Sequence, residues 1–242
     1  MKMQAARANE VHYRALHQEN LYLAIWYLLD HADGTVKAKT CNLVGNLCRH
    51  SSFFYKTLVT PLTELSPGLY TPGGANANPP TILRRLIIRC SDEDRATRKF
   101  ACFAVGNAAF HSNVLYSHLS DAVRPLVDAM RDVDEKTRAN AAGALGNLVR
   151  NSSELCEQLI AHNVIQCLLD VAMRDPKDGP KRIALFSLGT ISVYSRSRPG
   201  LETLEPPILE CLKVMEERHS SDTQILEHIK RIRNKMSQQS IP

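Results

Sequence analysis

Residues 132–150 read DVDEKTRANAAGALGNLVR, and residues 92–110 read DEDRATRKFACFAVGNAAF. When the second stretch is shifted by 40 positions, eight of the 19 aligned residues are identical. Agreement of this extent indicates an internal repeat. Each copy opens with an aspartate that can cap a helix and contains a Gly-Asn pair near its end. The chain is therefore expected to consist of stacked helical units.

Two weaker copies flank this pair, TVKAKTCNLVGNLCRH at 35–50 and KRIALFSLGTISVY at 181–194. The marker glycines fall at 45, 106, 146 and 189, so the last two spacings, 40 and 43 residues, match the period of helical-repeat proteins. The first spacing is about 21 residues longer than this period. The excess lies in Pro61–Pro80, which contains five prolines and three glycines, and we expect no regular structure there.

The clearest unit divides into three helices, expected at 113–119, 121–131 and 134–149, with Asp134 as the cap of the third. The third helix carries apolar residues at helical spacing, which predicts one buried stripe. These residues are Ala141, Ala144, Leu145, Leu148 and Val149. Further helices are expected at 153–160, 164–173 and 181–194.

Both ends of the chain are expected to cap the stack, because each repeat buries its apolar face only against a neighbour. Val11–Leu29 is predicted to form a helix that contains the single tryptophan, Trp26. A last helix, capped by Ser221 or Asp222, places Ile225, Ile229, Ile232 and Met236 on one face. Its basic residues Lys230, Arg231, Arg233 and Lys235 favour the negative end of the helix dipole. The predicted organisation is a capping region at 1–30, a first repeat at 31–60, an insertion at 61–80, three further repeats at 81–200 and capping helices at 201–242.

Composition excludes several classes of protein. With 44% hydrophobic and 23% charged residues, the chain can bury a core, and it contains no apolar run long enough for a membrane helix. The seven cysteines form no C-x-x-C pair, so we expect buried free thiols in a reducing, cytoplasmic compartment. No catalytic, kinase or metal-binding motif is present, and neither a cofactor nor a metal is expected.

The Gly-Asn pairs define a candidate site. On a helical projection Asn147 lies opposite the apolar stripe, and we expect stacked third helices to align such residues along one solvent-facing groove. The residues around each pair differ in chemistry from repeat to repeat. The candidate partner-binding residues are Asn42, Asn46 and Arg49 in the first repeat, Phe103, Asn107, Phe110 and His111 in the second, Asn147 and Arg150 in the third, and Phe186 in the fourth.

A carboxamide both donates and accepts hydrogen bonds, so an asparagine row can hold the backbone of an extended segment whatever its sequence. The phenylalanines between the amides would then select side chains. Two alternatives remain open. The asparagines can instead serve only the packing of neighbouring helices, and the 61–80 insertion can fold over Phe100, Phe103 and Phe110 as an internal plug.

The segment NAAGALGNLV at 140–149 resembles the third-helix motif of the armadillo family. This resemblance implies an all-α, right-handed α-solenoid of about four armadillo/HEAT-like repeats with capping helices. It also implies that Asn46, Asn107 and Asn147 line the concave face and clamp an extended peptide. The fourth position is Thr190, where such a ladder should weaken.

FAVGNAA at 103–109 together with AAGALGNLV at 141–149 is similar to the C-terminal armadillo region of Fused-type serine/threonine kinases. The resemblance implies a non-catalytic docking region of a longer kinase. Its partners would be kinesin-like or Hedgehog-pathway proteins, with roles at cilia, the axoneme or microtubules. Two other functions are weighed against it: a scaffold that docks through convex faces or the 61–80 loop, and nucleic-acid binding, which the evenly spread net charge of +5 disfavours.

Overall fold

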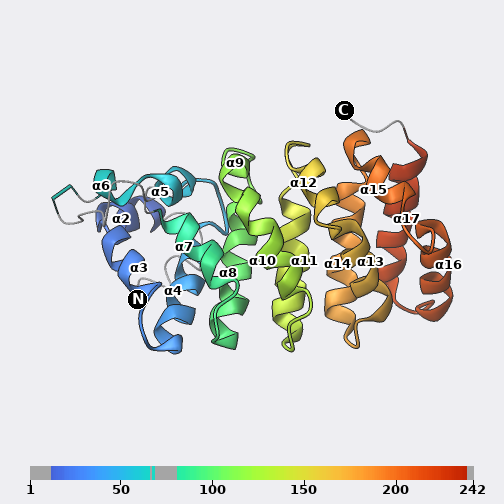
Figure 1. Ribbon diagram of the computed structural model, residues 1–242, viewed down its shortest axis with the longest axis horizontal. Coiled ribbons are helices and arrows are strands. Elements are labelled where there is room, and N and C mark those ends of the chain that lie inside the picture. Colours follow the sequence, from blue (N-terminus) through green and yellow to red (C-terminus); the bar gives the residue numbers. More distant parts are fainter. Residues whose placement is uncertain (1–11, 66, 69–80, 239–242) are drawn as a thin grey trace. The chain divides into compact units, whose positions relative to one another are not determined.

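A computed structural model describes residues 12–65, 67–68 and 81–238 (Figure 1). Helices make up nearly all of the regular structure in these residues, and no β-strand occurs among them. The predicted all-α fold class is thereby confirmed. The chain divides into two compact units, Met1–Pro125 and Leu126–Pro242, which are described separately below.

No helix in the described ranges combines the length and the apolar character that crossing a membrane requires.

Unit 1 is built around two long helices that pack side by side, α4 and α8. The shorter α7 packs on α8, and α5 packs on α7 (Figure 1). Its elements are α2 (Tyr13–Gln18), α3 (Tyr22–Leu28), α4 (Gly34–Leu47), α5 (Tyr55–Val59), α6 (Leu62–Leu65), α7 (Ile82–Arg89), α8 (Arg95–Ala108), α9 (Tyr116–Leu119) and the 3₁₀ turn η2 (Ser120–Ala122). Helix α10 (Val123–Ala129) leads from unit 1 into unit 2.

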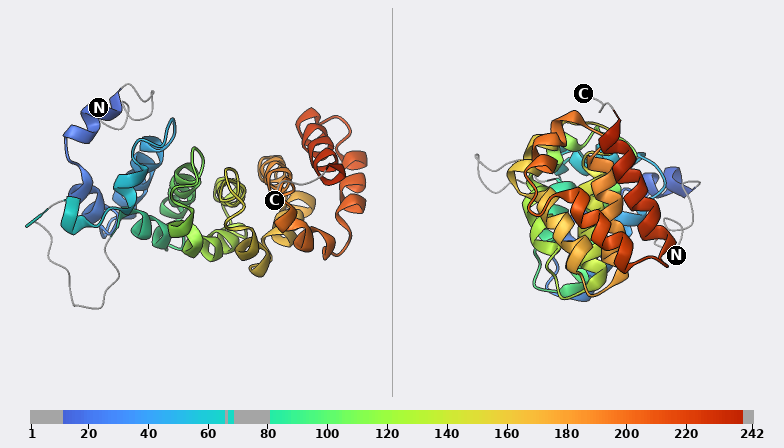
Figure 2. Two further views of the ribbon diagram at one scale, coloured as in Figure 1. Left: turned by 90° about the horizontal axis from the view of Figure 1, so that it is seen from above. Right: turned by 90° about the vertical axis from the view of Figure 1, so that its right-hand side faces the viewer.

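Unit 2 has α14 at its centre, because this helix packs against α11, α13 and α17 (Figure 2). Helix α16 packs in turn on α17 and on α13. The elements are α11 (Glu135–Asn147), α12 (Cys156–Ala161), α13 (Val164–Arg174), α14 (Asp178–Ile191), the 3₁₀ turn η3 (Ser195–Ser197), α15 (Arg198–Glu202), α16 (Ile208–Arg218) and α17 (Thr223–Ser237). The three predicted helices of the clearest repeat correspond to α9, α10 and α11.

Aspartates cap the long helices α4, α8, α11 and α17, whereas Lys177 precedes α14 and makes no side-chain cap bond. The Asp94 carboxylate accepts the Thr97 N–H at 2.7 Å, and the Asp134 carboxylate accepts the Thr137 N–H at 2.9 Å. Asp222 rather than Ser221 caps α17. These bonds satisfy amides of the first turn that have no partner inside the helix.

The marker glycines allow close packing of successive long helices. A Cβ atom on Gly45 would lie 2.5 Å from the Phe103 ring, and one on Gly146 would lie 2.5 Å from Ser187 Oγ. Both distances are shorter than a van der Waals contact, so any larger residue would force the helices apart. The repeated glycine is thus a packing requirement of the α4–α8 and α11–α14 pairs.

Two expectations about regular structure are wrong. The helix predicted over Val11–Leu29 is interrupted, because Asn20 adopts a left-handed conformation with φ of 47° between α2 and α3. The Pro61–Pro80 insertion is not wholly irregular, since α6 forms within it directly after Pro61. Residues 69–80 lie outside the described residues, and the proposed plug over the phenylalanines falls there.

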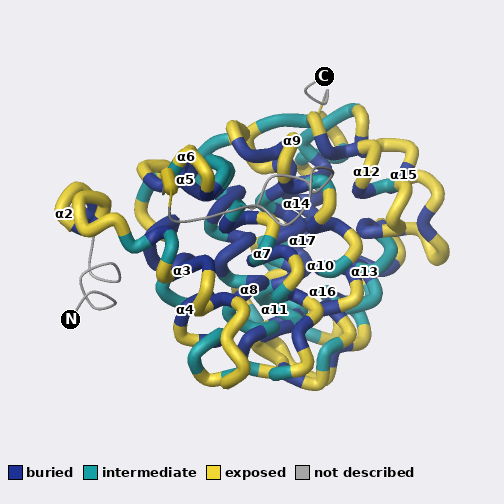
Figure 3. The backbone as a smooth tube through the Cα atoms, turned by 60° about the vertical axis from the view of Figure 1, so that its left-hand side comes forward, coloured by how far each residue is buried: buried dark blue, intermediate teal, exposed yellow. Residues whose placement is uncertain are grey.

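Buried residues recur along the helices of each unit, whereas the connecting loops are mostly exposed (Figure 3). The seven cysteines are free thiols and six are buried, with burial raising the pKa of Cys41 and Cys48 to about 12. Cys41 and Cys48 therefore pack in the core, as expected. The expectation that every cysteine is buried is wrong for Cys167, which is half-exposed beside a cavity.

Candidate functional site

The candidate residues lie on the long helix of each repeat, on what we call the third-helix face. In unit 1 this face belongs to α4 and α8, and in unit 2 it belongs to α11, α14 and α17. Successive helices within a unit are in direct contact, so equivalent positions become neighbours. Repetition in sequence is thereby converted into adjacency in space.

Asn46 does not face solvent, contrary to the helical projection. Asn46 is only 3% exposed, and its side-chain amide donates to the Asn42 carbonyl oxygen at 2.8 Å within α4. The Asn46 carbonyl oxygen accepts the Tyr13 hydroxyl at 2.8 Å, so α2 covers this end of α4. The projection placed Asn46 correctly relative to α4 but could not include a helix that folds over it.

Asn107 takes part in packing and still presents an acceptor. Its amide donates to the Gly45 carbonyl oxygen at 2.8 Å and so connects α8 to α4. Its backbone carbonyl oxygen accepts the Tyr55 hydroxyl. The side chain is half-buried, and no described residue donates to its side-chain oxygen. The amide nitrogen of Asn107 is used within unit 1, and the amide oxygen can accept a hydrogen bond from a ligand.

The predicted aromatic residues Phe100, Phe103 and Phe110 are half-buried rather than exposed. Phe103 packs over Gly45, and the Phe110 ring meets the His111 ring edge-on at 4.9 Å. His111 donates from Nε2 to the carbonyl oxygen of the exposed Arg49 at 3.0 Å. These candidates therefore form one continuous surface across the ends of α4 and α8.

In unit 2 the predicted residues Asn147 and Arg150 lie at the end of α11, where Asn147 is half-buried and Arg150 is exposed. The Tyr194 hydroxyl donates to the Arg150 carbonyl oxygen at 3.5 Å. Phe186 and Thr190 lie one helical turn apart on α14, and the Thr190 hydroxyl donates to the Phe186 carbonyl oxygen at 3.2 Å. Threonine thus takes the place that asparagine holds in the other repeats.

Two residues of this face were missed by the sequence reasoning, His228 and Arg231 on α17. The Arg231 guanidinium carbon lies 4.7 Å from the centre of the Phe186 ring, and the His228 ring meets Phe186 edge-on at 5.7 Å. Arg231 was assigned only to the helix dipole. Their spacing of three residues, on the side of α17 that carries no isoleucine, was the available signal.

Ion pairs connect the start of each long helix to the next repeat within a unit. Lys37 Nζ lies 2.8 Å from Asp92 in unit 1, and Arg138 contacts Asp175 at 2.6 Å in unit 2. Burial raises the pKa of the Asp175 carboxyl, but hydrogen bonds from Arg138 and the Lys177 N–H outweigh it and hold the pKa below its usual value. These pairs fix the register of the helices that carry the face.

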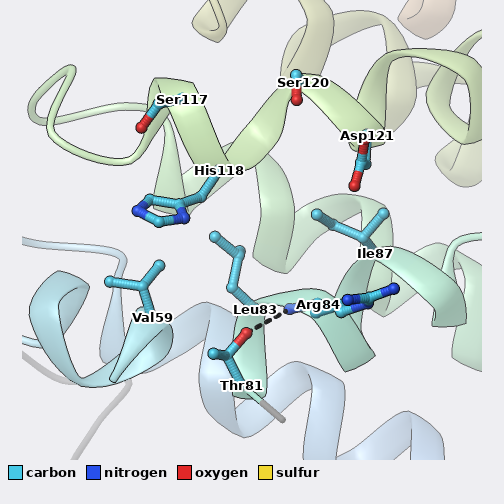
Figure 4. Close-up of a pocket in the computed structure, with 9 residues that line it drawn as sticks. All are labelled: Val59, Thr81, Leu83, Arg84, Ile87, Ser117, His118, Ser120 and Asp121. Atoms are coloured by element: carbon cyan, nitrogen blue, oxygen red, sulfur yellow. Dashed lines mark hydrogen bonds between the residues drawn. The ribbon is translucent and has the colours of Figure 1, made fainter. Parts of the chain in front are cut away.

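A separate cavity of about 270 Å³ lies in unit 1, away from the third-helix face (Figure 4). It is lined by residues of α5, α7, α9 and η2, among them Val59, Leu83, Ile87 and His118. The Arg84 backbone N–H, at its edge, donates to the Thr81 hydroxyl as a helix cap. Within the described ranges no three His, Cys, Asp or Glu residues gather as metal ligands.

Known proteins resemble this chain in sequence and in fold. The HEAT-like repeat family matches residues 95–148. Serine/threonine-protein kinase 36 of Pongo abelii is 32% identical over 180 residues, which cover 74% of this chain and 12% of the kinase. Serine/threonine-protein kinase TIO of Arabidopsis thaliana is 36% identical over 196 residues, covering 76% of this chain and 13% of that kinase. The chain thus spans about an eighth of the length of these relatives.

A designed armadillo repeat protein, solved in complex with the peptide (KR)4, matches 98% of this chain and 90% of its own with a TM-score of 0.80. The two sequences are 18% identical, so this likeness concerns the fold alone. The predicted resemblance to armadillo repeats and to Fused-type kinases is confirmed. The chain has the α-solenoid fold of armadillo/HEAT repeat proteins and, over about three quarters of its length, is similar to one segment of Fused-type serine/threonine-protein kinases.

Proposed function

We propose that this chain is a protein-interaction module that binds an extended partner segment on its third-helix faces. The observation that carries the proposal is Asn107, whose amide is anchored on the Gly45 carbonyl oxygen while its side-chain oxygen receives no bond from a described residue. An anchored acceptor costs little entropy to use, because it is already ordered before the ligand arrives. Asn46 takes no part, since it is buried under α2.

The surroundings of Asn107 support a peptide rather than a small molecule as ligand. The half-buried Phe103 and Phe110 and the exposed Arg49 flank it along the face. Extended segments are recognised by backbone hydrogen bonds that give affinity and by neighbouring side chains that give specificity. The designed armadillo protein of the same fold carries a bound peptide, which agrees with this mode.

The similarity to Fused-type kinases extends the proposal. The chain would be the non-catalytic docking region of a longer kinase and would engage a kinesin-like or Hedgehog-pathway protein at cilia or microtubules. We test this by capture of such a partner from cells with the whole chain as bait. If substitutions in the third-helix face leave this capture unchanged, the result would instead favour a scaffold that docks through another surface.

The direct test is to pan a phage library of 15-residue peptides against the whole chain and against an Asn107→Ala, Asn147→Ala double variant. We expect enriched peptides to bind the double variant at least tenfold more weakly, which corresponds to about 1.4 kcal/mol. Asn113→Ala is the matched control, because this asparagine is exposed in the loop before α9. Failure to enrich any peptide, or equal binding to the double variant, contradicts the proposal, and thermal unfolding checks that both variants are folded.

A further inference from the structure

The strongest unassigned feature of unit 2 is a cationic aromatic cluster formed where α17 packs on α14. Phe186 lies between two side chains of α17, with Arg231 over its ring face and His228 at its edge. Arg231 Nη2 donates to the Thr190 hydroxyl at 3.3 Å, and the Arg231 Cδ atom lies 3.5 Å from where a Gly189 Cβ would stand. The guanidinium is therefore held by the Phe186 ring and the Thr190 hydroxyl before any ligand binds.

The replacement of asparagine by Thr190 has a structural consequence here. In unit 1 the equivalent Asn107 extends its amide to the previous helix, whereas Thr190 is short and accepts a bond from Arg231 of the next helix. An arginine thus supplies the polar group at the repeat position where other repeats place a carboxamide. A neutral, two-way hydrogen-bonding group is exchanged for a positively charged donor.

Charges of both signs lie around the cluster, but the one that acts on Arg231 is positive. Burial lowers the pKa of Arg231, and the positive charge of Arg150 lowers it further. Asp222 binds Arg182 at 2.8 Å and Glu216 binds Arg233 at 2.7 Å, while Glu227 acts on the His228 ring. No carboxylate of the described residues forms an ion pair with Arg231, which remains half-buried on Phe186. A carboxylate at this point would compensate the cost of burying the Arg231 charge and would offset the repulsion from Arg150.

We propose that the Phe186–Arg231 cluster is a subsite for an acidic residue, aspartate or glutamate, of a bound peptide segment. The planar guanidinium receives the carboxylate side-on, and Phe186 packs against the aliphatic part of the same or the neighbouring residue. The inference rests on the proposed function and assigns the partner's chemistry in unit 2. It predicts a preference for acidic segments at this position rather than for acidic proteins in general.

The test uses three dye-labelled peptides of equal length, (Glu-Ser)4, (Gln-Ser)4 and (Lys-Ser)4, and measures fluorescence anisotropy with the whole chain. We expect (Glu-Ser)4 to bind at least tenfold more tightly than (Gln-Ser)4 and (Lys-Ser)4 to bind most weakly. Arg231→Gln should weaken (Glu-Ser)4 about tenfold. The affinity of the Arg231→Lys variant for (Glu-Ser)4 should lie between those of the unaltered chain and the Arg231→Gln variant, because lysine keeps the positive charge and lacks the planar guanidinium.

Lys213→Gln is the control, since it removes one exposed positive charge from α16 and leaves the cluster intact. Equal binding of the acidic and neutral peptides, or equal losses in the Lys213 and Arg231 variants, overturns the inference. A single-stranded oligonucleotide that displaces (Glu-Ser)4 at equal concentration, and depends on Arg231, also overturns it by assigning the surface to phosphates. Enriched library peptides that need Asn107 and Asn147 but carry no acidic residue would refute this subsite and leave the proposed function standing.

Discussion

Units 1 and 2 place the same repeat position in different chemical roles. In unit 1 Asn107 joins α8 to the backbone of the preceding helix through its amide. In unit 2 Thr190 receives the side chain of the following helix, Arg231. The two units share glycine contacts and ion pairs that hold the helices together, so the repeat keeps its packing while the residue after the glycine varies.

The largest expected effect concerns the ion pairs that set helix register. Arg138→Ala in unit 2 leaves the Asp175 carboxylate, 3% exposed, with the Lys177 N–H as its remaining donor, and should lower the free energy of unfolding by about 3 kcal/mol. Lys37→Ala in unit 1 should cost about 1 kcal/mol, because Arg89 still contacts Asp92 at 2.8 Å. Urea denaturation of the whole chain measures both. Arg174→Ala, which removes an exposed pair, is the control, and equal costs for the Arg138 and Lys37 variants would refute the ranking.

The cost of Arg138→Ala should also depend on pH. The folded pKa of Asp175 lies below its usual value, so its contribution to stability is present above about pH 4 and is lost as the pH falls through the folded pKa. The stability difference between the unaltered chain and Arg138→Ala should therefore narrow between pH 7 and pH 3. Denaturation at a series of pH values measures this difference. A gap that stays constant or widens on acidification would show that the pair acts through packing rather than charge.

An intermediate effect is expected at the marker glycines of unit 2. Gly146→Ala places a Cβ atom 2.9 Å from the Ser187 Cα, and backbone cannot move aside cheaply, so the loss should be about 2 kcal/mol. Gly189→Ala meets nothing closer than 3.4 Å and should be neutral or stabilising by about 0.5 kcal/mol through helix propensity. Thermal and urea unfolding compare the two. Similar losses at both positions would mean that helix flexibility rather than close packing accounts for the glycines.

The smallest effects compare the two face residues themselves. Asn107→Ala removes the bond to the Gly45 carbonyl oxygen and should cost about 1 kcal/mol. Thr190→Ala removes two longer bonds of 3.2 and 3.3 Å, while alanine favours the helix, so its cost should be below about 0.5 kcal/mol. Urea unfolding measures both, with Asn113→Ala as the neutral reference. A larger cost at Thr190 would mean that the threonine, rather than the asparagine, holds neighbouring helices together.

Much of the fold could be predicted because it depends on local, repeated signals. The Asp134 cap, the Ala-Leu stripe of α11 and the isoleucines of α17 are each read from neighbours in sequence, and the structure confirms them. The break at Asn20 was not predictable in this way, since a single left-handed residue leaves the apolar pattern unchanged. The helix α6 could not be predicted from the sequence, because the prolines around it indicate irregular structure.

The candidate site was predictable only in outline. The projection places Phe103 and Asn107 on one face of α8, because they share one helix and its period, and Phe110 follows the end of that helix. It failed for Asn46, which Tyr13 and α2 cover from 33 residues away. It also missed Arg231, whose position over Phe186 depends on how α17 docks on α14.

The amino-acid sequence by itself determined the repeat length, the helices and the glycine positions, because caps, periodicity and backbone freedom act over a few residues. Only the tertiary structure decided which asparagine is buried, which keeps an acceptor and where an arginine of the next helix reaches the repeat position. The physical reason is that exposure and charge at one residue are set by side chains distant in sequence, whose approach depends on the packing of whole helices.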